Sequence, residues 1–402
     1  MQRWARDPML AVIETHPVQY HAPVYRAVQA QFGIPVTAIY GSDFSVNRYR
    51  DAEFGTSFAW DTDLVGGYAQ RFLSHTPSDA TPDVSAISAK GVGDALRSVN
   101  PSAVLLVGYS PAFHRRAWYE AWRFGRPLLF RGETSDVPQS SSAVVGLAKH
   151  VGLRLAYQTC SRVLFIGSRS RQHYKSLGVS DAQLVSAPYC VDTTPFRGDE
   201  DARGRLRAPA RAALGLTPGS LVVMFAGKLT ARKGVDLLPA AVSMLPEALR
   251  SRAVLLFVGE GAMRADLEAT ARTLGVTARF AGFRSQHDLS ECYHAADILA
   301  LPSRFAETWG LVVNEALYHG VPCAVSDRVG CVPDLIDGST GAVCAADSAP
   351  GLAAALVAVA RLADQDETRV RCRQLVASYS VDAAAAGLAQ AYRAATAQAA
   401  AA

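Results

Sequence analysis

Short apolar runs alternate with longer helical patterns along the whole chain, as is typical of βαβ units around parallel sheets. In the first half, the pattern predicts strands at 9–13, 34–40, 103–107, 127–130 and 163–166. It predicts amphipathic helices at 115–125 and 142–160. The second half restarts the alternation, with strands predicted at 221–226, 254–258, 298–301 and 322–325. The pattern therefore indicates an α/β protein of two units, each built on a parallel sheet.

The segment 194–219 separates the two halves and is charged and rich in Gly and Pro. This composition suits a linker with a short helix near its end. We therefore expect an N-terminal domain over 1–196, a linker over 197–218 and a C-terminal domain over 219–379. The remaining residues, 380–402, are rich in alanine. Ser380 can cap a helix that runs through Tyr392, with a frayed tail beyond it.

The composition is that of a folded protein with reduced thiols. Of the 402 residues, 50% are hydrophobic and 19% are charged, with a formal charge of +4. This mild basic excess suits anionic small molecules or a lipid surface and does not indicate nucleic acid. The seven cysteines are scattered and form no C-x-x-C pair, which argues against a disulfide framework or a zinc site.

The N-terminal residues lack the apolar core of a signal peptide, because Glu14, His16 and Pro17 interrupt it. No run of 18 apolar residues is free of charge, so we expect a cytoplasmic protein without a spanning helix. Peripheral contact with the inner face of the membrane is an alternative, because two helices carry basic and tryptophan side chains that suit an anionic surface. A solvated helix face fits the same pattern. These residues are Arg115, Arg116, Trp118, Trp122, Arg123, Arg126, Lys149, Arg154 and Arg162.

The segment 301–320 carries the most informative pattern. A buried strand ends near Leu301, a loop carries Glu307, and a helix begins near Gly310 with Glu315 inside it. The free amides at the start of that helix suit a diphosphate, and carboxylates accept hydrogen bonds from ribose and sugar hydroxyls.

A ligand that is itself anionic needs cationic partners as well. Lys228 and Lys233 lie just past the strand 221–226. Ligands of open α/β sheets bind at the carboxyl ends of the strands, so both ammonium groups can reach such a ligand. They can hold a diphosphate and stabilise it as it leaves, which is the work of a metal ion in other enzymes.

These motifs resemble those of the retaining glycosyltransferases of family GT4. The resemblance covers roughly residues 220–345 and rests on G-K-L-x-x-x-K-G (227–234), V-G-E-G (258–261), A-G-F (281–283) and E-x7-E-A-x-x-x-G-x-P (307–322). It implies the GT-B fold, in which two Rossmann-like, doubly wound domains face a central cleft. In that fold the C-terminal helix returns to the N-terminal domain.

The resemblance also implies roles for individual residues. Glu307 contacts the donor sugar near the reacting carbon, and Lys228 and Lys233 bind the diphosphate, with Lys228 standing where the family more often has Arg. Glu315 binds the ribose. The other donor-binding residues implied are Gly259, Phe283, Arg284, Thr308, Trp309, Gly310, Leu311 and Val312, with Phe283 and Arg284 beside the base.

The N-terminal half is expected to bind the acceptor. Residues 16–23 resemble a bacterial subset of the family that opens with H-P-x-Q-Y-H-A-P, and they lack the usual glycine-rich loop. His16 and His21 are candidates for contact with the acceptor or a phosphate, and a role in holding the loop fits them equally. The loop 130–136 lacks the histidine that many members have. Arg131 and Glu133 are the candidate replacements, and an ion pair between them that holds the loop is the alternative.

We therefore expect an enzyme that transfers a hexose from a UDP- or GDP-sugar to a hydroxyl of a saccharide, lipid-linked or small-molecule acceptor. The resemblance implies retention through front-face attack. No cofactor and no metal ion are expected, because the D-x-D motif at Asp61 and Asp63 lies in the acceptor half. Alternatives are a catalytically silent nucleotide-sugar-binding subunit and a sugar phosphorylase or epimerase of the same fold. A dinucleotide oxidoreductase is disfavoured because no G-x-G-x-x-G follows the first strand.

Overall fold

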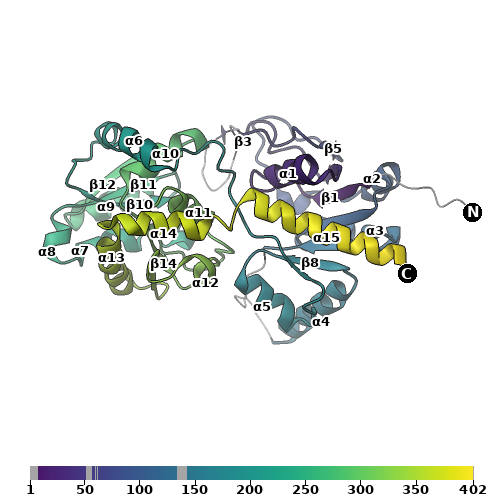
Figure 1. Ribbon diagram of the computed structural model, residues 1–402. Helices are drawn as coiled ribbons and strands as arrows, with labels where there is room; N and C mark the ends of the chain where they lie inside the picture. Colours follow the sequence, from purple (N-terminus) through teal and green to yellow (C-terminus); the bar gives the residue numbers. More distant parts are fainter. Residues whose placement is uncertain (1–7, 51–56, 59, 61, 134–142, 402) are drawn as a thin grey trace, which may run out of the picture. The chain divides into compact units, whose positions relative to one another are not determined.

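The structure, a computed structural model, describes residues 8–50, 57, 58, 60, 62–133 and 143–401. The chain divides into two compact units (Figure 1). The first contains the described residues up to Cys190 together with the C-terminal residues from Ser380. The second contains Val191–Tyr379.

The first unit is a parallel sheet of seven strands in the order β5-β2-β1-β6-β7-β8-β9. The strands are β1 (Leu10–Glu14), β2 (Val36–Tyr40), β5 (Ala69–Phe72), β6 (Ala103–Val107), β7 (Leu128–Arg131), β8 (Arg162–Phe165) and β9 (Leu184–Ser186), beside a separate antiparallel pair of β3 (Tyr49–Arg50) and β4 (Ser57–Phe58). The helices are α1 (Ala22–Phe32), α2 (Val92–Val99), α3 (Ala112–Phe124), α4 (Ala143–Gln158), α5 (Ser168–Ser176) and α15 (Val381–Ala401), with a 3-10 turn η1 (Val84–Ala86).

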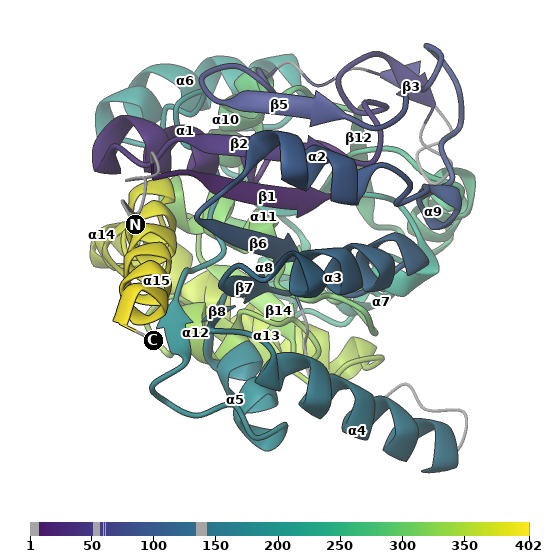
Figure 2. The same ribbon diagram turned by 90° about the vertical axis from the view of Figure 1, so that its right-hand side faces the viewer.

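Helices cover both faces of this sheet, so its central strands are apolar throughout. Leu10 and Val12 of β1 pack in a core with α1 and α15, whereas Ala11 and Ile13 pack in a core with α2 and α3. Figure 1 shows α15 beside α1, and Figure 2 shows α2 beside α3. The alternation of side chains along β1 thus determines which helices each residue meets.

The second unit is a parallel sheet of six strands in the order β12-β11-β10-β13-β14-β15. The strands are β10 (Leu221–Ala226), β11 (Ala253–Val258), β12 (Thr277–Gly282), β13 (Ile298–Leu301), β14 (Cys323–Ser326) and β15 (Gly341–Cys344). The helices are α6 (Glu200–Ala213), α7 (Leu237–Ser243), α8 (Glu247–Arg250), α9 (Arg264–Thr273), α10 (Gln286–Ala295), α11 (Leu311–Tyr318), α12 (Val332–Leu335), α13 (Ala349–Ala363) and α14 (Asp366–Val376), with a 3-10 turn η2 (Ala231–Lys233).

Both sheets have a switch point, where the chain stops adding strands on one side and crosses to the other. The neighbours at the switch are β1 and β6 in the first sheet, and β10 and β13 in the second. Open α/β sheets bind ligands at the carboxyl ends of the strands beside such a point. The loops that follow these four strands are therefore the expected places for sites.

The segment 197–218, expected to be a linker, instead folds as part of the second unit. It contains α6, which is capped by Asp199 through a hydrogen bond from Ala202 N to Oδ1 at 2.7 Å. The helix packs against α10. Its length of 14 residues exceeds the short helix predicted for this segment.

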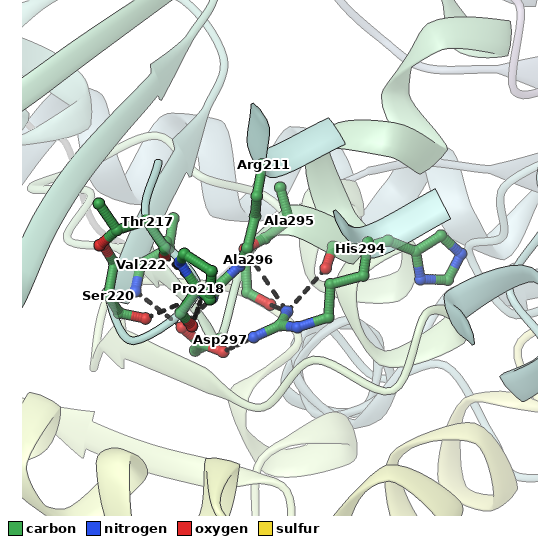
Figure 3. A network of polar contacts seen from close by, with 10 residues as sticks. Arg211, Thr217, Pro218, Ser220, Val222, His294, Ala295, Ala296 and Asp297 are labelled. Atoms are coloured by element: carbon green, nitrogen blue, oxygen red, sulfur yellow. Dashed lines mark hydrogen bonds and ion pairs between the residues drawn. The ribbon is translucent and has the colours of Figure 1, made fainter. Parts of the chain in front are cut away.

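Two arginines of α6 hold this helix to the amino end of the second sheet. Arg207 and Arg211 bind the two carboxylate oxygens of Asp297 at 2.5 and 2.7 Å. Asp297 directly precedes β13 and also accepts a hydrogen bond from Val222 N of β10 at 2.8 Å. The Arg211 guanidinium donates further to backbone carbonyls of Ala295, Thr217, Pro218 and Ser220 (Figure 3). The charged residues of this segment, which suggested a linker, are thus partners in a network at the sheet.

The C-terminal helix α15 packs on the first unit, as predicted. Ser380 Oγ accepts a hydrogen bond from Ala383 N at 3.2 Å, which confirms the predicted cap. The prediction of a frayed tail after Tyr392 is wrong for the described residues, because the helix continues to Ala401. Alanine has the highest helix propensity, so a run of alanines prolongs a helix that packing has already formed.

Candidate functional site

In the second unit, an ion pair joins the loops after β10 and β13. Lys233 ends the turn η2, and its Nζ is paired with Oε2 of Glu307. The two side chains are only 16% and 11% exposed. Ser303 Oγ donates a hydrogen bond to the same carboxylate oxygen at 2.8 Å. Two residues expected to be catalytic, Lys233 and Glu307, therefore meet at the switch point of this sheet.

Backbone contacts hold the loop of Glu307 in place. Gly330 N donates to Glu307 O at 3.0 Å, and Cys331 N donates to Trp309 O at 2.9 Å. The neighbouring Arg304 binds both carboxylate oxygens of Asp236, at 2.6 and 2.7 Å. The loop is thus tied on two sides, to the segment after β14 and to the segment after η2. A carboxylate on such a loop is positioned before a ligand arrives.

The N-terminus of α11 follows this loop directly and has no side-chain cap. Gly310 is its N-cap residue at φ +97°, and a Cβ there would lie 2.8 Å from Cγ1 of Val329. Glycine alone tolerates both conditions. The first amides of a helix, here those of Leu311 and Val312 after Gly310, have no acceptor within the helix and can bind an anionic group. This arrangement agrees with the predicted diphosphate site, and binding itself stays a prediction.

Thr308 and Trp309 form the turn before Gly310. Thr308 is half-buried. The Trp309 indole is 2% exposed, and its Nε1 donates to Oδ1 of Asn314 at 2.8 Å. The predicted contact of Trp309 with the donor stays a prediction, although the indole presents almost no exposed surface. The indole braces the first turn of α11.

Glu315 is buried within α11, where it is 4% exposed. Tyr293 of α10 donates a hydrogen bond to its Oε2 at 2.6 Å. Burial raises the pKa of Glu315 to about 7, although the Tyr293 hydrogen bond opposes this rise. Glu315 and Glu307 thus have different surroundings: a phenol faces one and an ammonium group faces the other. The predicted contact of Glu315 with a ribose stays a prediction.

The other predicted donor residues follow β10, β11 and β12 of the same sheet. Lys228 is half-buried after β10, and Phe283 and Arg284 are exposed after β12, Phe283 by 38%. Gly259 follows β11 at φ +129°, and a Cβ there would lie 2.1 Å from the carbonyl oxygen of Gly227. Its missing side chain lets the loops after β10 and β11 touch. All four residues lie at the carboxyl end of the sheet that carries Lys233.

In the first unit, His21 lies between two carboxylates at the carboxyl end of the sheet. Its Nδ1 donates to Glu14 Oε1 at 2.6 Å and its Nε2 donates to Glu133 Oε1 at 3.2 Å. Tyr25 and Tyr189 donate to the same two oxygens at 2.7 and 2.5 Å. We call these five residues the His21 cluster. The structure thus brings together His21 and Glu133, two of the predicted acceptor-side residues.

The His21 cluster is ionic. Burial alone would lower the pKa of His21, but attraction to Glu14 and hydrogen bonds with both carboxylates raise it to about 9. Burial would raise the pKa of Glu133, but the hydrogen bonds from His21 and Tyr189 lower it. At neutral pH the cluster therefore contains an imidazolium ion between carboxylate groups.

The sequence reasoning missed Glu14, Tyr25 and Tyr189. One signal was available for Glu14, because a charged residue that ends a buried strand lies where open α/β sheets bind ligands. The two tyrosines gave no such signal, since a tyrosine in an apolar segment is most often part of a core.

Arg131 ends β7 and lies beside this cluster. It is 3% exposed, and its guanidinium carbon lies 5.6 Å from the centre of the Tyr189 ring. Arg131 and Glu133 do not form the ion pair that was the alternative. Glu133 pairs with His21 instead, and two nitrogens of Arg131 have no partner among the described residues. The His16 ring packs against Phe44 with ring centres 4.2 Å apart, and burial lowers the pKa of His16 to about 4. Contact of either residue with an acceptor or a phosphate stays a prediction.

The basic helix predicted at 115–125 is α3, and it does not present both tryptophans to solvent. Trp118 is 8% exposed and donates from Nε1 to Thr159 Oγ1 at 3.0 Å, so its predicted part in membrane contact is wrong. Trp122 is 56% exposed. Of the arginines, Arg116 pairs with Glu120 at 2.8 Å. Across the residues that the structure describes, no helix combines the length and apolar character that a membrane span requires.

A pocket of about 570 Å³ lies along α2 and α3, outside both charged sites. Its lining includes Lys90, Arg97, Arg116 and Arg123 together with Asp94 and Glu120. Arg97 binds Asp94 at 2.5 Å, and Glu120 binds Arg116, so the carboxylates already neutralise part of the basic charge. The pocket shares no residue with the Lys233–Glu307 pair or with the His21 cluster.

Asp61 lies outside the described residues. The carboxylate of Asp63 accepts hydrogen bonds from Val65 N and Gly66 N at 3.0 and 2.8 Å, which stabilise a turn. In the ranges that the structure describes, no three His, Cys, Asp or Glu side chains gather as a metal site would require. Independence from metal ions stays a prediction. All seven cysteines are buried, and none of them forms a disulfide within the described ranges.

Comparison with known proteins gives the following likenesses. Residues 207–391 match the family model of the glycosyl transferases group 1. A D-inositol 3-phosphate glycosyltransferase of Nocardia farcinica is 28% identical over 316 residues, which cover 72% of this chain and 68% of that protein. Sucrose-phosphate synthase from Thermosynechococcus elongatus has a TM-score of 0.68 at 20% identity, over 96% of this chain and 98% of that chain.

HepE of Anabaena, solved in complex with UDP and glucose, has a TM-score of 0.66 at 14% identity, over 95% of this chain and 98% of that chain. At these identities the two solved structures speak for the fold alone. Together with the two parallel sheets described above, they confirm the predicted GT-B fold.

Proposed function

Residues 207–391 match the glycosyl transferases group 1, and from that match we propose that this chain transfers a hexose from a UDP- or GDP-sugar to an acceptor hydroxyl with retention of configuration. It is a glycosyltransferase that uses a nucleotide sugar. The nature of the nucleotide and the sugar, and the stereochemical course, are the parts that we propose.

The Lys233–Glu307 pair beside the N-terminus of α11 is the observation that supports this function best. A nucleoside diphosphate carries several negative charges, and its recognition needs fixed positive groups. Lys233 supplies an ammonium group, and the first amides of α11 supply hydrogen bonds and the positive end of the helix dipole. Lys228, after the same strand, supplies a second ammonium group. The site therefore contains the groups that stabilise a diphosphate as it leaves.

Glu307 is the group that we assign to the sugar. In the free protein its carboxylate is neutralised by Lys233 and held by Ser303. When a diphosphate engages Lys233, this carboxylate becomes an acceptor for sugar hydroxyls close to the reacting carbon. It also favours the positive charge that develops on the sugar ring in an oxocarbenium-like transition state. The acceptor hydroxyl attacks from the face that the diphosphate leaves, and the diphosphate takes the proton.

Binding of nucleotides to the full chain tests the donor site. We expect UDP or GDP to raise the melting temperature of the wild type. Lys233→Ala should weaken that nucleotide about 10- to 100-fold, because a hydrogen bond to a charged group contributes roughly 1.5–3 kcal/mol. Arg250→Ala is the matched control, since it removes an exposed cation of the same unit. Equal affinities in wild type and Lys233→Ala would remove the proposed role of this lysine.

The stereochemical course is tested by proton NMR of the transferred sugar. Retention predicts that the product has the anomeric configuration of the donor, and an inverted product would contradict the proposed mechanism. Release of the nucleoside diphosphate only when an acceptor is added distinguishes transfer from a silent subunit. Release of sugar 1-phosphate on addition of inorganic phosphate would indicate a phosphorylase instead.

A further inference from the structure

The guanidinium group of Arg131 is buried with two donors that no described residue accepts from. Its Nε and Nη2 are shielded from solvent and have no hydrogen-bond partner among the described residues. Buried donors are nearly always paired, because a buried donor that lacks an acceptor destabilises the fold. The nearby Tyr189 ring does not supply an acceptor, because its hydroxyl donates to Glu133. The fold thus maintains an unfavourable group at the carboxyl end of β7.

The two unmet nitrogens lie on one edge of the guanidinium. The N–H groups on this edge point in parallel, which matches the two oxygens of a carboxylate or phosphate group. No other side chain of the described residues satisfies this edge. The group is therefore arranged for a bidentate oxyanion.

A second unmet group lies at the same level of the sheet. The register pairs Arg131 with Val107 of β6, and β6 pairs with β1 up to Leu106 and Ile13, so Glu14 lies level with Arg131 across β6. Their Cα atoms are two strand spacings apart, roughly 10 Å. Both side chains project on the face of α1, since alternate residues share a face and Val12 and Leu129 pack there. Glu14 Oε2 is buried without a partner among the described residues.

These positions flank the switch point between β1 and β6. The His21 cluster accounts for the other charges there, because His21 binds one oxygen of Glu14 and one of Glu133. In the described part of this region, one pair of donors on Arg131 and one acceptor on Glu14 lack partners, and they lie at opposite sides of β6. A molecule that carries an oxyanion and a hydroxyl group supplies both complements.

We propose that Arg131 binds a phosphate or carboxylate group of the acceptor, and that Glu14 accepts a hydrogen bond from one of its hydroxyls. This rests on the proposed function, because it names the class of acceptor for that transfer. The acceptor is then a polyhydroxylated acid, such as a sugar or polyol phosphate or a uronic acid. Arg131 is a binding residue in this account and takes no part in the chemical step.

Inorganic phosphate is the probe for this site, and it is titrated into the full chain in the Lys233→Ala background. That background weakens the proposed donor site, so stabilisation by phosphate reports other sites. We expect a phosphate-dependent rise in melting temperature that weakens about tenfold or more with Arg131→Lys, which keeps the charge but loses the paired N–H groups. Arg97→Lys is the matched control, because it alters the separate basic pocket along α2 and α3. A phosphate effect that Arg97→Lys removes and Arg131→Lys spares overturns the proposal.

A second measurement uses unmutated Arg131. The arginine Nε–H resonance that disappears in the Arg131→Lys spectrum identifies it, and phosphate should shift that resonance in a saturable manner. A resonance that phosphate leaves unchanged overturns the proposal and indicates a trapped water as the only partner. If UDP shifts this resonance and phosphate does not, the oxyanion at Arg131 belongs to the donor. That result also overturns the assignment to the acceptor.

Failure of this proposal is distinguishable from failure of the proposed function. UDP or GDP binding that depends on Lys233 supports the donor site whatever phosphate does at Arg131. Conversely, phosphate binding at Arg131 without any nucleotide binding would retain the oxyanion site and leave the transfer reaction unsupported.

Discussion

Replacement of Glu315 by Gln should stabilise the protein, and more so as the pH rises. Burial raises the pKa of this carboxyl to about 7 in the folded protein, from an ordinary value of 4.5. Below pH 4.5 the folded and unfolded states are both protonated, so the group favours neither. Between pH 4.5 and 7 the unfolded state ionises first, and stability falls with rising pH. Above pH 7 the loss in the free energy of unfolding reaches its full value of about 3 kcal/mol, because each pKa unit corresponds to roughly 1.4 kcal/mol.

Glutamine keeps an oxygen for the Tyr293 hydroxyl and does not ionise, so Glu315→Gln abolishes this loss. The free energy of unfolding should exceed that of the wild type by about 3 kcal/mol at pH 8 and by less than about 1 kcal/mol at pH 5. Urea unfolding at both pH values measures the difference. Glu268→Gln is the control, because Glu268 is a surface residue, 40% exposed, in the same unit. A gain that is the same at pH 5 and pH 8 would refute the reasoning from burial.

Three further changes test other parts of the molecule. Asp297→Asn should destabilise the second unit by about 3–5 kcal/mol in urea unfolding, because it leaves the buried Arg211 without its carboxylate; a loss below 1 kcal/mol would contradict the role of this network. Glu307→Gln should lower the rate of transfer roughly 100-fold, whereas the affinity for the nucleotide should change less than tenfold. Steady-state kinetics measures the rate, and calorimetry measures the affinity. A parallel loss of rate and affinity would instead indicate that Glu307 binds the nucleotide. His21→Gln should cost about 3 kcal/mol at pH 6, and this difference from the wild type should shrink as the pH rises from 6.5 to 9, because the raised pKa of His21 stabilises the folded state only while the imidazole is protonated. A difference that does not depend on pH would exclude the imidazolium.

The interior strands of both sheets could be predicted from the sequence, and the edge strands could not. The strands β6, β10 and β13 occur at the residues predicted, because helices cover both of their faces and each strand is a continuous apolar run. Within the two parallel sheets, the four strands without a prediction are β5, β9, β12 and β15, and these are the four edges. An edge strand is less buried, so its sequence can be polar, as in the exposed residues of β5.

The two candidate sites also differ in how far the sequence predicts them. The donor side is encoded locally, because Glu307, Gly310 and Glu315 lie within one loop and the helix that follows it. Their spacing therefore identified them. Lys233 comes from another loop, but the switch-point rule brings the loops after β10 and β13 together. The burial of the Trp309 indole was not predicted, since spacing does not reveal which side of a turn packs into the core.

The acceptor side is assembled from distant segments, and this explains both what the sequence missed and what the structure adds. Glu14 ends β1, Arg131 ends β7 and Tyr189 follows β9, so no sequence window contains two of them. Only the sheet order places β1 and β7 on either side of β6. A charged residue at the end of a buried strand is costly unless something pairs with it. In this protein His21 pairs with Glu14 and Glu133, and two nitrogens of Arg131 have no partner among the described residues, so the fold tolerates an unfavourable group at the place where ligands of such sheets bind.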